Sequence, residues 1–301
     1  MVMSSHPGTF SIVAADLETG EVGVAVQSRY FSVGSVVPWA QAGVGAVATQ
    51  AAGIAVYGKH ALEELARGAT PEDALTRVLA DDPGRETRQL GIVTADGRAA
   101  AFTGTSCNEW AGHRTGPGFA VQGNILAGEA VVEAMAHAYQ ETLGPLVERL
   151  VAALEAGQAA GGDRRGQQSA AVIVERAGGR AESREGIDRI CDLRVEDHAE
   201  PIAELRRLVG IWTTWDAQRN AHAAYERGEP GAAVDILTAS LAASGEDGAV
   251  LYNLACYEAL AGRHEAALGH VRRSFELEPS FRELAADDKD LDSIRSALAG
   301  L

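Results

Sequence analysis

Cysteine is scarce in this 301-residue sequence, which contains only Cys107, Cys191 and Cys256, far apart and without a CxxC spacing. This argues against both a disulfide framework and a cysteine zinc site, and we expect the three to be small buried apolar side chains. The eight histidines form no HxH or HExxH pattern. We therefore expect neither a metal site nor a cofactor.

Long apolar runs are also missing, and none approaches the roughly 18 residues that a membrane span requires. The residues Met1 to Gly8 contain neither a basic region nor an apolar stretch of the kind found in secretory signals, so we expect a cytoplasmic protein. Basic residues are outnumbered, with 26 Lys and Arg against 42 Asp and Glu and a net charge of −16. This acidity excludes nucleic acid and anionic membranes as expected partners, because both would repel the chain.

Two common catalytic and binding motifs are absent. The sequence has no GxSxG nucleophile elbow and no GxGxxG phosphate loop. A classical serine hydrolase and a nucleotide-binding protein are therefore both disfavoured.

Short extended segments are present in blocks through the first two thirds of the chain. The first block opens with a predicted hairpin, in which Thr9–Ala14 and Val22–Gln27 flank the turn pair Thr19-Gly20. The further predicted strands are Val36–Trp39, Gly45–Thr49, Gln89–Thr94, Arg98–Thr103, Phe119–Gly123 and Ser169–Arg176.

Pairs of predicted helices separate these blocks. The best-marked helix starts at Thr70-Pro71-Glu72-Asp73, with a Thr N-cap, proline in the first turn and early acids, and runs to about Ala80. The others are Ala61–Arg67, Glu129–Thr142 and Gly144–Ala156. Because the strands do not alternate singly with helices, we expect an α+β fold, a four-layer αββα sandwich of two sheets with helices outside.

The last part of the chain is alanine-rich and helical in pattern from Trp215 onward. Shifting it by 34 residues pairs Ala221 with Ala255 and Ala233 with Ala267. This period and the small residues resemble tetratricopeptide repeats. We expect two domains, residues 9–210 and a helical-repeat tail at 216–301, and because two repeats leave apolar faces unburied, the tail should dock on the first domain, a second subunit or a partner protein.

Thr9 is the leading candidate nucleophile. Gly8-Thr9 opens the first predicted strand. If the bond between them were cut, the free α-amine of Thr9, with a pKa near 8, could accept the proton of its own Oγ1 while that oxygen attacks a carbonyl. Glycine before the nucleophile suits self-cleavage because it permits strained backbone.

At this point the chain resembles the N-terminal nucleophile hydrolases and, more closely, the DUF1028 family. The segments that carry the resemblance are Thr9-Phe-Ser-Ile-Val-Ala14, Gly23-Val-Ala-Val26 with Ser28-Arg29, Val36-Val-Pro-Trp39, Gly45-Ala-Val-Ala-Thr-Gln50, Gln122-Gly-Asn-Ile-Leu126 and Gly162-Asp-Arg-Arg-Gly-Gln-Gln-Ser-Ala170. The resemblance spans about Thr9–Leu208. It implies the αββα fold and an amide-bond hydrolase that self-associates.

Four residues are assigned catalytic roles: Thr9, Gln50, Asn124 and Asp163. Gln50 and Ala51 are placed at an oxyanion-binding turn before a helix, although Thr49-Gln50 could equally cap that helix. Gln122-Gly123-Asn124 could orient a substrate amide, or it could be an Asx turn.

The loop from Asp163 to Ser169 is assigned to the edge of the site. Asp163 could hold the Thr9 ammonium, and Arg164 or Arg165 could bind a substrate carboxylate, unless the loop is simply solvated. The substrate-binding candidates are Ser28, Arg29, Gln122, Arg164, Arg165 and Ser169. Arg29 could order Thr9 or form a structural ion pair. No lysine is well placed to activate Thr9, the nearest being Lys59.

The leading hypothesis is an amidohydrolase that acts on a small amide through Thr9. Two alternatives are retained: a catalytically silent module whose tail recruits a partner, and a small-ligand sensor built on the loops Gln122–Asn124 and Asp163–Ser169.

Overall fold

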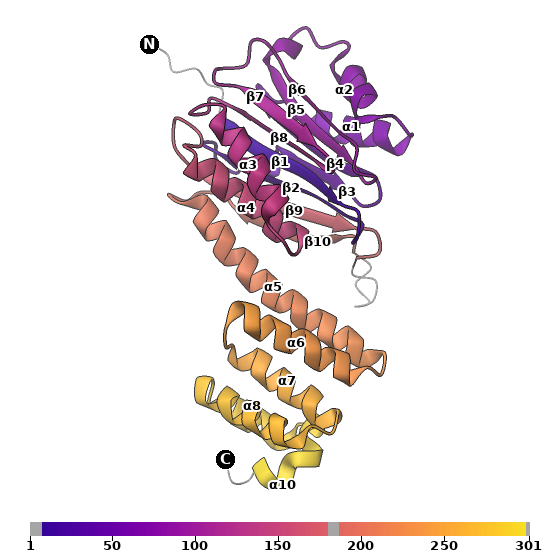
Figure 1. Ribbon diagram of the computed structural model, residues 1–301, viewed down its shortest axis with the longest axis vertical. Helices are drawn as coiled ribbons and strands as arrows, with labels where there is room; N and C mark the ends of the chain where they lie inside the picture. The colour runs from indigo at the N-terminus through magenta and orange to yellow at the C-terminus, as the bar shows by residue number, and fades with distance from the viewer. Residues whose placement is uncertain (1–7, 180–186, 299–301) are drawn as a thin grey trace. The chain divides into compact units, whose positions relative to one another are not determined.

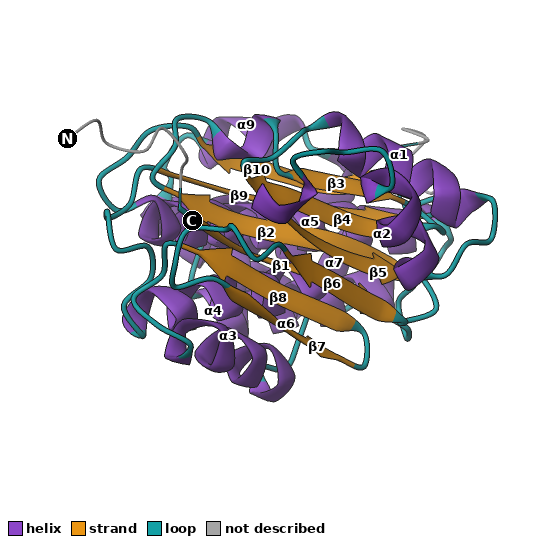
Figure 2. Ribbon diagram, turned by 90° about the horizontal axis from the view of Figure 1, so that it is seen from above, coloured by secondary structure: helices purple, strands orange, loops and turns teal. Residues whose placement is uncertain are grey.

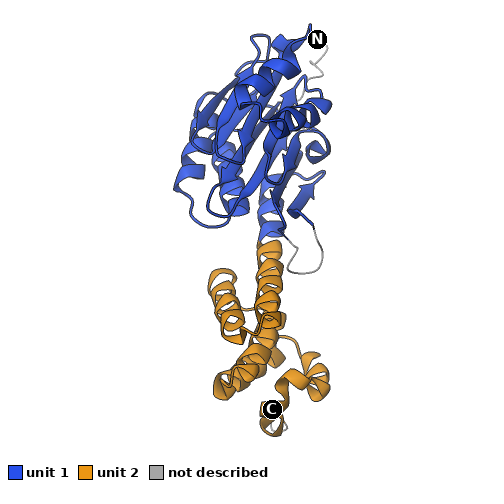
Figure 3. Ribbon diagram, turned by 90° about the vertical axis from the view of Figure 1, so that its right-hand side faces the viewer, with its two compact units in different colours: residues 1–209 blue, residues 210–301 orange. Residues whose placement is uncertain are grey.

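The computed structural model describes residues 8–179 and 187–298. The chain divides into two compact units, Met1–Val209 and Gly210–Leu301 (Figure 3). Strands are confined to the first unit in the described residues, and the second unit is helical. The fold is thus mixed α+β with a helical C-terminal region.

The first unit contains two antiparallel sheets, whose strands lie side by side in Figure 2. The six-stranded sheet has the order β10 (Arg189–Val195), β9 (Ser169–Arg176), β2 (Glu21–Ser28), β1 (Thr9–Asp16), β8 (Phe119–Asn124), β7 (Gly112–Gly116). The four-stranded sheet has the order β3 (Pro38–Gln41), β4 (Gly45–Ala51), β5 (Arg88–Thr94), β6 (Ala99–Thr103).

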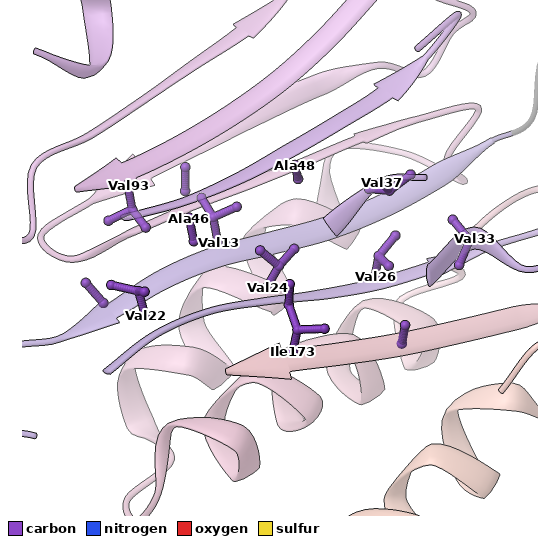
Figure 4. Close-up of a cluster of buried hydrophobic side chains, with 13 residues drawn as sticks. Val13, Val22, Val24, Val26, Val33, Val37, Ala46, Ala48, Val93 and Ile173 are labelled. Atoms are coloured by element: carbon purple, nitrogen blue, oxygen red, sulfur yellow. The ribbon is translucent and has the colours of Figure 1, made fainter. Parts of the chain in front are cut away.

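An apolar cluster fills the space between the two sheets (Figure 4). Val13, Val24 and Ile173 enter it from the six-stranded sheet, and Ala46 and Val93 enter it from the four-stranded sheet. Because strand side chains alternate between faces, Thr9 and Ser11 lie on the same face of β1 as Val13. The polar start of β1 therefore points into the layer between the sheets.

Helices cover the outer face of each sheet (Figure 1). The helices α1 (Val56–Ala66) and α2 (Pro71–Leu79) pack through Leu62 and Leu75 on β4 and β5. On the six-stranded sheet lie α3 (Ala130–Glu141) and α4 (Leu146–Ala159). The Thr70 hydroxyl accepts a hydrogen bond from the Asp73 amide at 3.1 Å, which confirms the predicted N-cap.

Three parts of the first unit differ from the sequence-based prediction. The strands β7 and β10 were not predicted. β7 is a short edge strand, largely exposed, with no apolar alternation, whereas β10 was missed although Cys191, Leu193 and Val195 alternate with charged residues along it. The predicted strand Val36–Trp39 is found two residues later, as β3 (Pro38–Gln41), and follows a 3-10 turn at Val33–Ser35. The helix predicted from Ala61 begins earlier, at Val56.

The second unit is built from helices in the described residues. They are α5 (Pro201–Glu226), which begins in the first unit, α6 (Pro230–Ser244), α7 (Gly248–Leu260), α8 (His264–Leu277), α9 (Phe281–Asp287) and α10 (Arg295–Leu298). Two apolar clusters join them. The prediction that helical structure starts at Trp215 was wrong, because α5 already begins at Pro201. No helix in the described ranges has the length and apolar character that a membrane crossing demands.

The interface between the sheets should dominate the stability of the first unit. Ile173 is 1% exposed within it, so Ile173→Ala should lower the free energy of unfolding by about 2–5 kcal/mol, through lost burial and the cavity left behind. Urea unfolding monitored by circular dichroism measures this. The control is Leu17→Ala, since Leu17 is 64% exposed and its change should stay within about 0.5 kcal/mol. Equal destabilisation by the two variants would contradict this assignment of the core.

Candidate functional site

The polar start of β1 lies beside the ends of two neighbouring strands. In the antiparallel register Thr9 is opposite Ser28 at the end of β2 and opposite Asn124 at the end of β8. Both neighbours are buried, and Thr9 is only 2% exposed. Three side chains that were assigned to the site from the sequence thus lie together where these three adjacent strands begin or end.

The hydroxyls of Thr9 and Ser28 form a directed chain toward the carbonyl of Gly8. Ser28 Oγ donates to Gly8 O at 2.6 Å, and it lies 3.0 Å from Thr9 Oγ1. A serine hydroxyl has one proton to donate. Because that proton is used on Gly8 O, the hydroxyl of Thr9 must be the donor to Ser28.

A guanidinium group reaches the same carbonyl. Arg165 Nη2 donates to Gly8 O at 2.9 Å and to Asp163 Oδ2 at 2.7 Å, while Arg165 Nε donates to Asp163 Oδ1 at 3.1 Å. The Asp163 side chain is fully buried, and its carboxylate also accepts the Arg29 amide at 3.3 Å. The carbonyl of the Gly8–Thr9 bond therefore accepts hydrogen bonds from a hydroxyl and a cation together.

Backbone pairing holds Asp163 in this place. Leu126 and Asp163 form an antiparallel bridge, and the Arg164 amide donates to Ile125 O at 3.0 Å. A Cβ added at Gly8 would lie 2.8 Å from Cγ and both carboxylate oxygens of Asp163. A side chain at position 8 would therefore displace the Asp163 carboxylate from its hydrogen bonds.

A cavity of about 410 Å³ opens beside the two hydroxyls. Its lining residues are Thr9, Ser28, Tyr30, Val33, Val36, Val37, Thr49, Gln50, Ala51, Ala52, Gly53 and Ala55. This volume lies in the range of ordinary small-molecule sites. The cavity therefore has room for a small substrate next to Thr9.

Buried amides connect the two sheets behind the cavity. Gln122 Nε2 donates to Ser11 Oγ, and Ser11 Oγ donates to Gln50 Oε1, both at 2.6 Å. Gln50 Nε2 then donates to Gln89 Oε1 at 2.8 Å and approaches the Thr9 carbonyl at 3.4 Å. This series of hydrogen bonds sets the orientation of the Gln50 side-chain amide.

Gln89 is the centre of this buried network. It is completely buried, and its Oε1 also accepts Asn124 Nδ2 at 3.0 Å, while its Nε2 donates to Gly123 O at 2.7 Å. Two residues further along β5, a side chain at Gly91 would collide with the Gln122 amide. Neither Gln89 nor Ser11 was predicted from the sequence. Ser11 lies between two apolar residues of a predicted strand, which was a usable signal, whereas Gln89 follows Arg88 at the start of β5 and gave none.

A smaller cavity of about 100 Å³ lies on the Asn124 side of the site. It shares Ala51 and Ala52 with the larger cavity. Ala51 has φ 67° and Ile125, next to Asn124, has φ 54°. Such left-handed conformations are strained for residues other than glycine and are concentrated at functional sites.

The sequence-based candidates fall into three groups in the structure. Thr9, Ser28 and Gln50 line the larger cavity, and Asn124 lines the smaller one. Asp163 and Arg165 surround the Gly8 carbonyl. Gln122 belongs to the amide network.

The predicted oxyanion-binding turn at Gln50 and Ala51 was wrong in its position. The helix after β4 begins only at Val56, so these two residues do not lie at the start of a helix.

The remaining candidates line neither cavity. Ser169 Oγ donates to Tyr30 O at 2.5 Å and accepts the Val33 amide at 3.0 Å, so it supports the cavity wall. The guanidinium of Arg29 faces the carbonyls of Arg165 and Gln167 at 3.4 and 3.5 Å. Arg164 is exposed.

Among the described residues no group of three or more His, Cys, Asp or Glu side chains could hold a metal ion.

Comparison with known proteins places the first unit in a family. Residues 9–205 match the model of DUF1028, a family of unknown function. A solved crystal structure of a DUF1028 protein from Silicibacter pomeroyi is 34% identical in sequence, with a TM-score of 0.62, and the match covers 69% of this chain and 90% of that one. The search of curated proteins gave no match. The chain belongs to the DUF1028 family.

The amide network should be essential for the stability of the site. Gln89→Leu would leave the Gln50 and Asn124 amides without their shared acceptor, and each unpaired buried group costs about 1–3 kcal/mol. We expect the free energy of unfolding to fall by at least about 2 kcal/mol in urea denaturation. Gln168→Leu is the control, because Gln168 bonds Asp197 at an exposed position and its loss should cost little. An unchanged stability for Gln89→Leu would contradict the described network.

Proposed function

We propose that this protein is an N-terminal nucleophile amidohydrolase that frees Thr9 by cutting its own Gly8–Thr9 bond. The observation that carries the proposal is the convergence of Ser28 Oγ and Arg165 Nη2 on the Gly8 carbonyl. Two sheets packed face to face with helices outside are also what we expect of that class, so the fold is consistent with the proposal. The cavity beside Thr9 supplies space for a substrate.

The proposed self-cleavage begins with attack of Thr9 Oγ1 on the carbonyl carbon of Gly8. The proton of Thr9 passes to Ser28 Oγ as Ser28 gives its own proton to Gly8 O, along the hydrogen-bonded chain described above. Until that proton arrives, the Arg165 guanidinium stabilises the partial negative charge on this oxygen, and the intermediate that forms is neutral. The C–N bond then breaks, the proton returns to the departing nitrogen, and water hydrolyses the ester between Gly8 and Thr9 Oγ1.

The same nucleophile serves turnover once the α-amine of Thr9 is free. With a pKa near 8, the amine accepts the Oγ1 proton during attack on a substrate amide. The substrate's acyl group becomes an ester on Oγ1, its amine leaves with the proton, and water releases the acid. Asp163, buried beside Gly8, is suited to orient the charged form of the amine.

For the second unit we propose a tetratricopeptide-like array. Ala221, Ala233, Ala255 and Ala267 have no exposed surface in its two apolar clusters. They form two pairs with the 34-residue spacing found in the sequence. Small residues at equivalent positions allow close helix packing in such repeats.

Intact mass and N-terminal sequencing test the proposed cleavage. We expect the purified wild type to begin at Thr9 and Thr9→Ala to remain uncut. Ser28→Ala should slow cleavage by about 10²–10³-fold, because it removes the proton relay and one donor to the developing oxyanion.

Arg164→Ala is the matched control for this series. It removes an exposed charge beside Arg165 and should cleave at the wild-type rate. Either a folded wild type that retains the Gly8–Thr9 bond or a Thr9→Ala variant cut at the same bond would refute self-cleavage by Thr9.

A further inference from the structure

We infer that the larger cavity binds the acyl part of the substrate and that this acyl part is uncharged and mainly aliphatic. The inference rests on the proposed amidohydrolase function and specifies its substrate class. Its basis is the lining of the two cavities, which is mainly apolar in the larger one and contains more polar side chains in the smaller one.

The described residues lining the cavity carry no formal charge. Val33, Val36 and Val37 form one part of the wall, and Ala51, Ala52 and Ala55 another. The polar groups are hydroxyls and a single amide, and that amide is already paired with Ser11 and Gln89. A carboxylate placed here would lose its hydration without a cationic side chain to pair with, because the Thr9 amine that cleavage frees is assigned to Asp163 and must be neutral to act as the base.

The cations near the site are directed away from this cavity. Arg165 pairs with Asp163, a contact that does not involve Gly8 and so remains after cleavage, and Arg29 faces the backbone of the loop that follows Asp163. Arg164 is exposed and does not line the cavity. The structure therefore favours a neutral acyl group over the substrate carboxylate that the sequence analysis assigned to Arg164 or Arg165.

The covalent chemistry decides which half of the substrate amide occupies the larger cavity. The acyl group stays attached to Thr9 Oγ1 until water releases it, whereas the amine departs after the first step. Thr9 itself lines the larger cavity but not the smaller one. The smaller cavity, lined by Ser106, Asn108 and Asn124 among others, lies on the other flank of Thr9 and suits a polar amine.

The test compares anilides of one amine that differ only in the acyl group. Protein shown by mass to begin at Thr9 is assayed with pentanoyl and succinyl anilides, which are similar in length but differ in charge. We expect kcat/KM for the pentanoyl compound to be at least tenfold higher. Val36→Lys places a cation in the cavity wall and should lower the ratio of the two kcat/KM values or invert it. Ser35→Lys adds the same charge at an exposed neighbouring residue that does not line the cavity, and its ratio should equal that of the wild type.

Binding of small amides to the wild type provides a second readout that does not depend on turnover. Ligand-observed NMR should detect pentanamide and not succinamate. If pentanamide binds but no anilide is hydrolysed, the cavity assignment stands and the proposed hydrolase activity fails. Equal or stronger binding of succinamate, faster hydrolysis of the succinyl anilide, or no detectable binding of pentanamide would overturn the inference.

Discussion

The hydrogen bonds to the Gly8 carbonyl are the interaction on which the site depends. Ser28 reaches this oxygen because β2 ends opposite the start of β1, and Arg165 reaches it because Asp163 is bridged to Leu126 just beyond β8. Three strand ends and one loop must therefore be in place before the carbonyl is polarised. We expect cleavage competence to appear only after the six-stranded sheet has formed.

Much of the fold could be predicted from the sequence, because its central elements have strong local signals. The hairpin of β1 and β2 follows from apolar segments around a turn, and the start of α2 follows from the capping residue Thr70. The edge strand β7 could not be predicted in the same way, because it is short, largely exposed and has no apolar alternation. The other edge strand, β10, was missed although Cys191, Leu193 and Val195 alternate with charged residues along it.

The positions of the candidate site could be predicted from the sequence, but its contacts could not. Thr9, Ser28 and Asp163 were assigned to one site, and in the structure they lie around the Gly8–Thr9 bond. The sequence could not distinguish Arg165, which contacts Gly8, from exposed Arg164. Gln89 was missed because its role arises only where the two sheets meet, and no spacing along the chain encodes that contact.

Refolding of uncleaved chain from denaturant tests the central proposal most directly, because folding and cleavage are then observed in one tube. The segment released by cleavage and the new N-terminus at Thr9 are followed by mass spectrometry at several protein concentrations. Attack by Thr9 on its own chain predicts first-order cleavage after Gly8, at a rate independent of protein concentration. A chain that refolds fully and stays uncut, or one that is cut only when cell extract is added, would contradict self-cleavage.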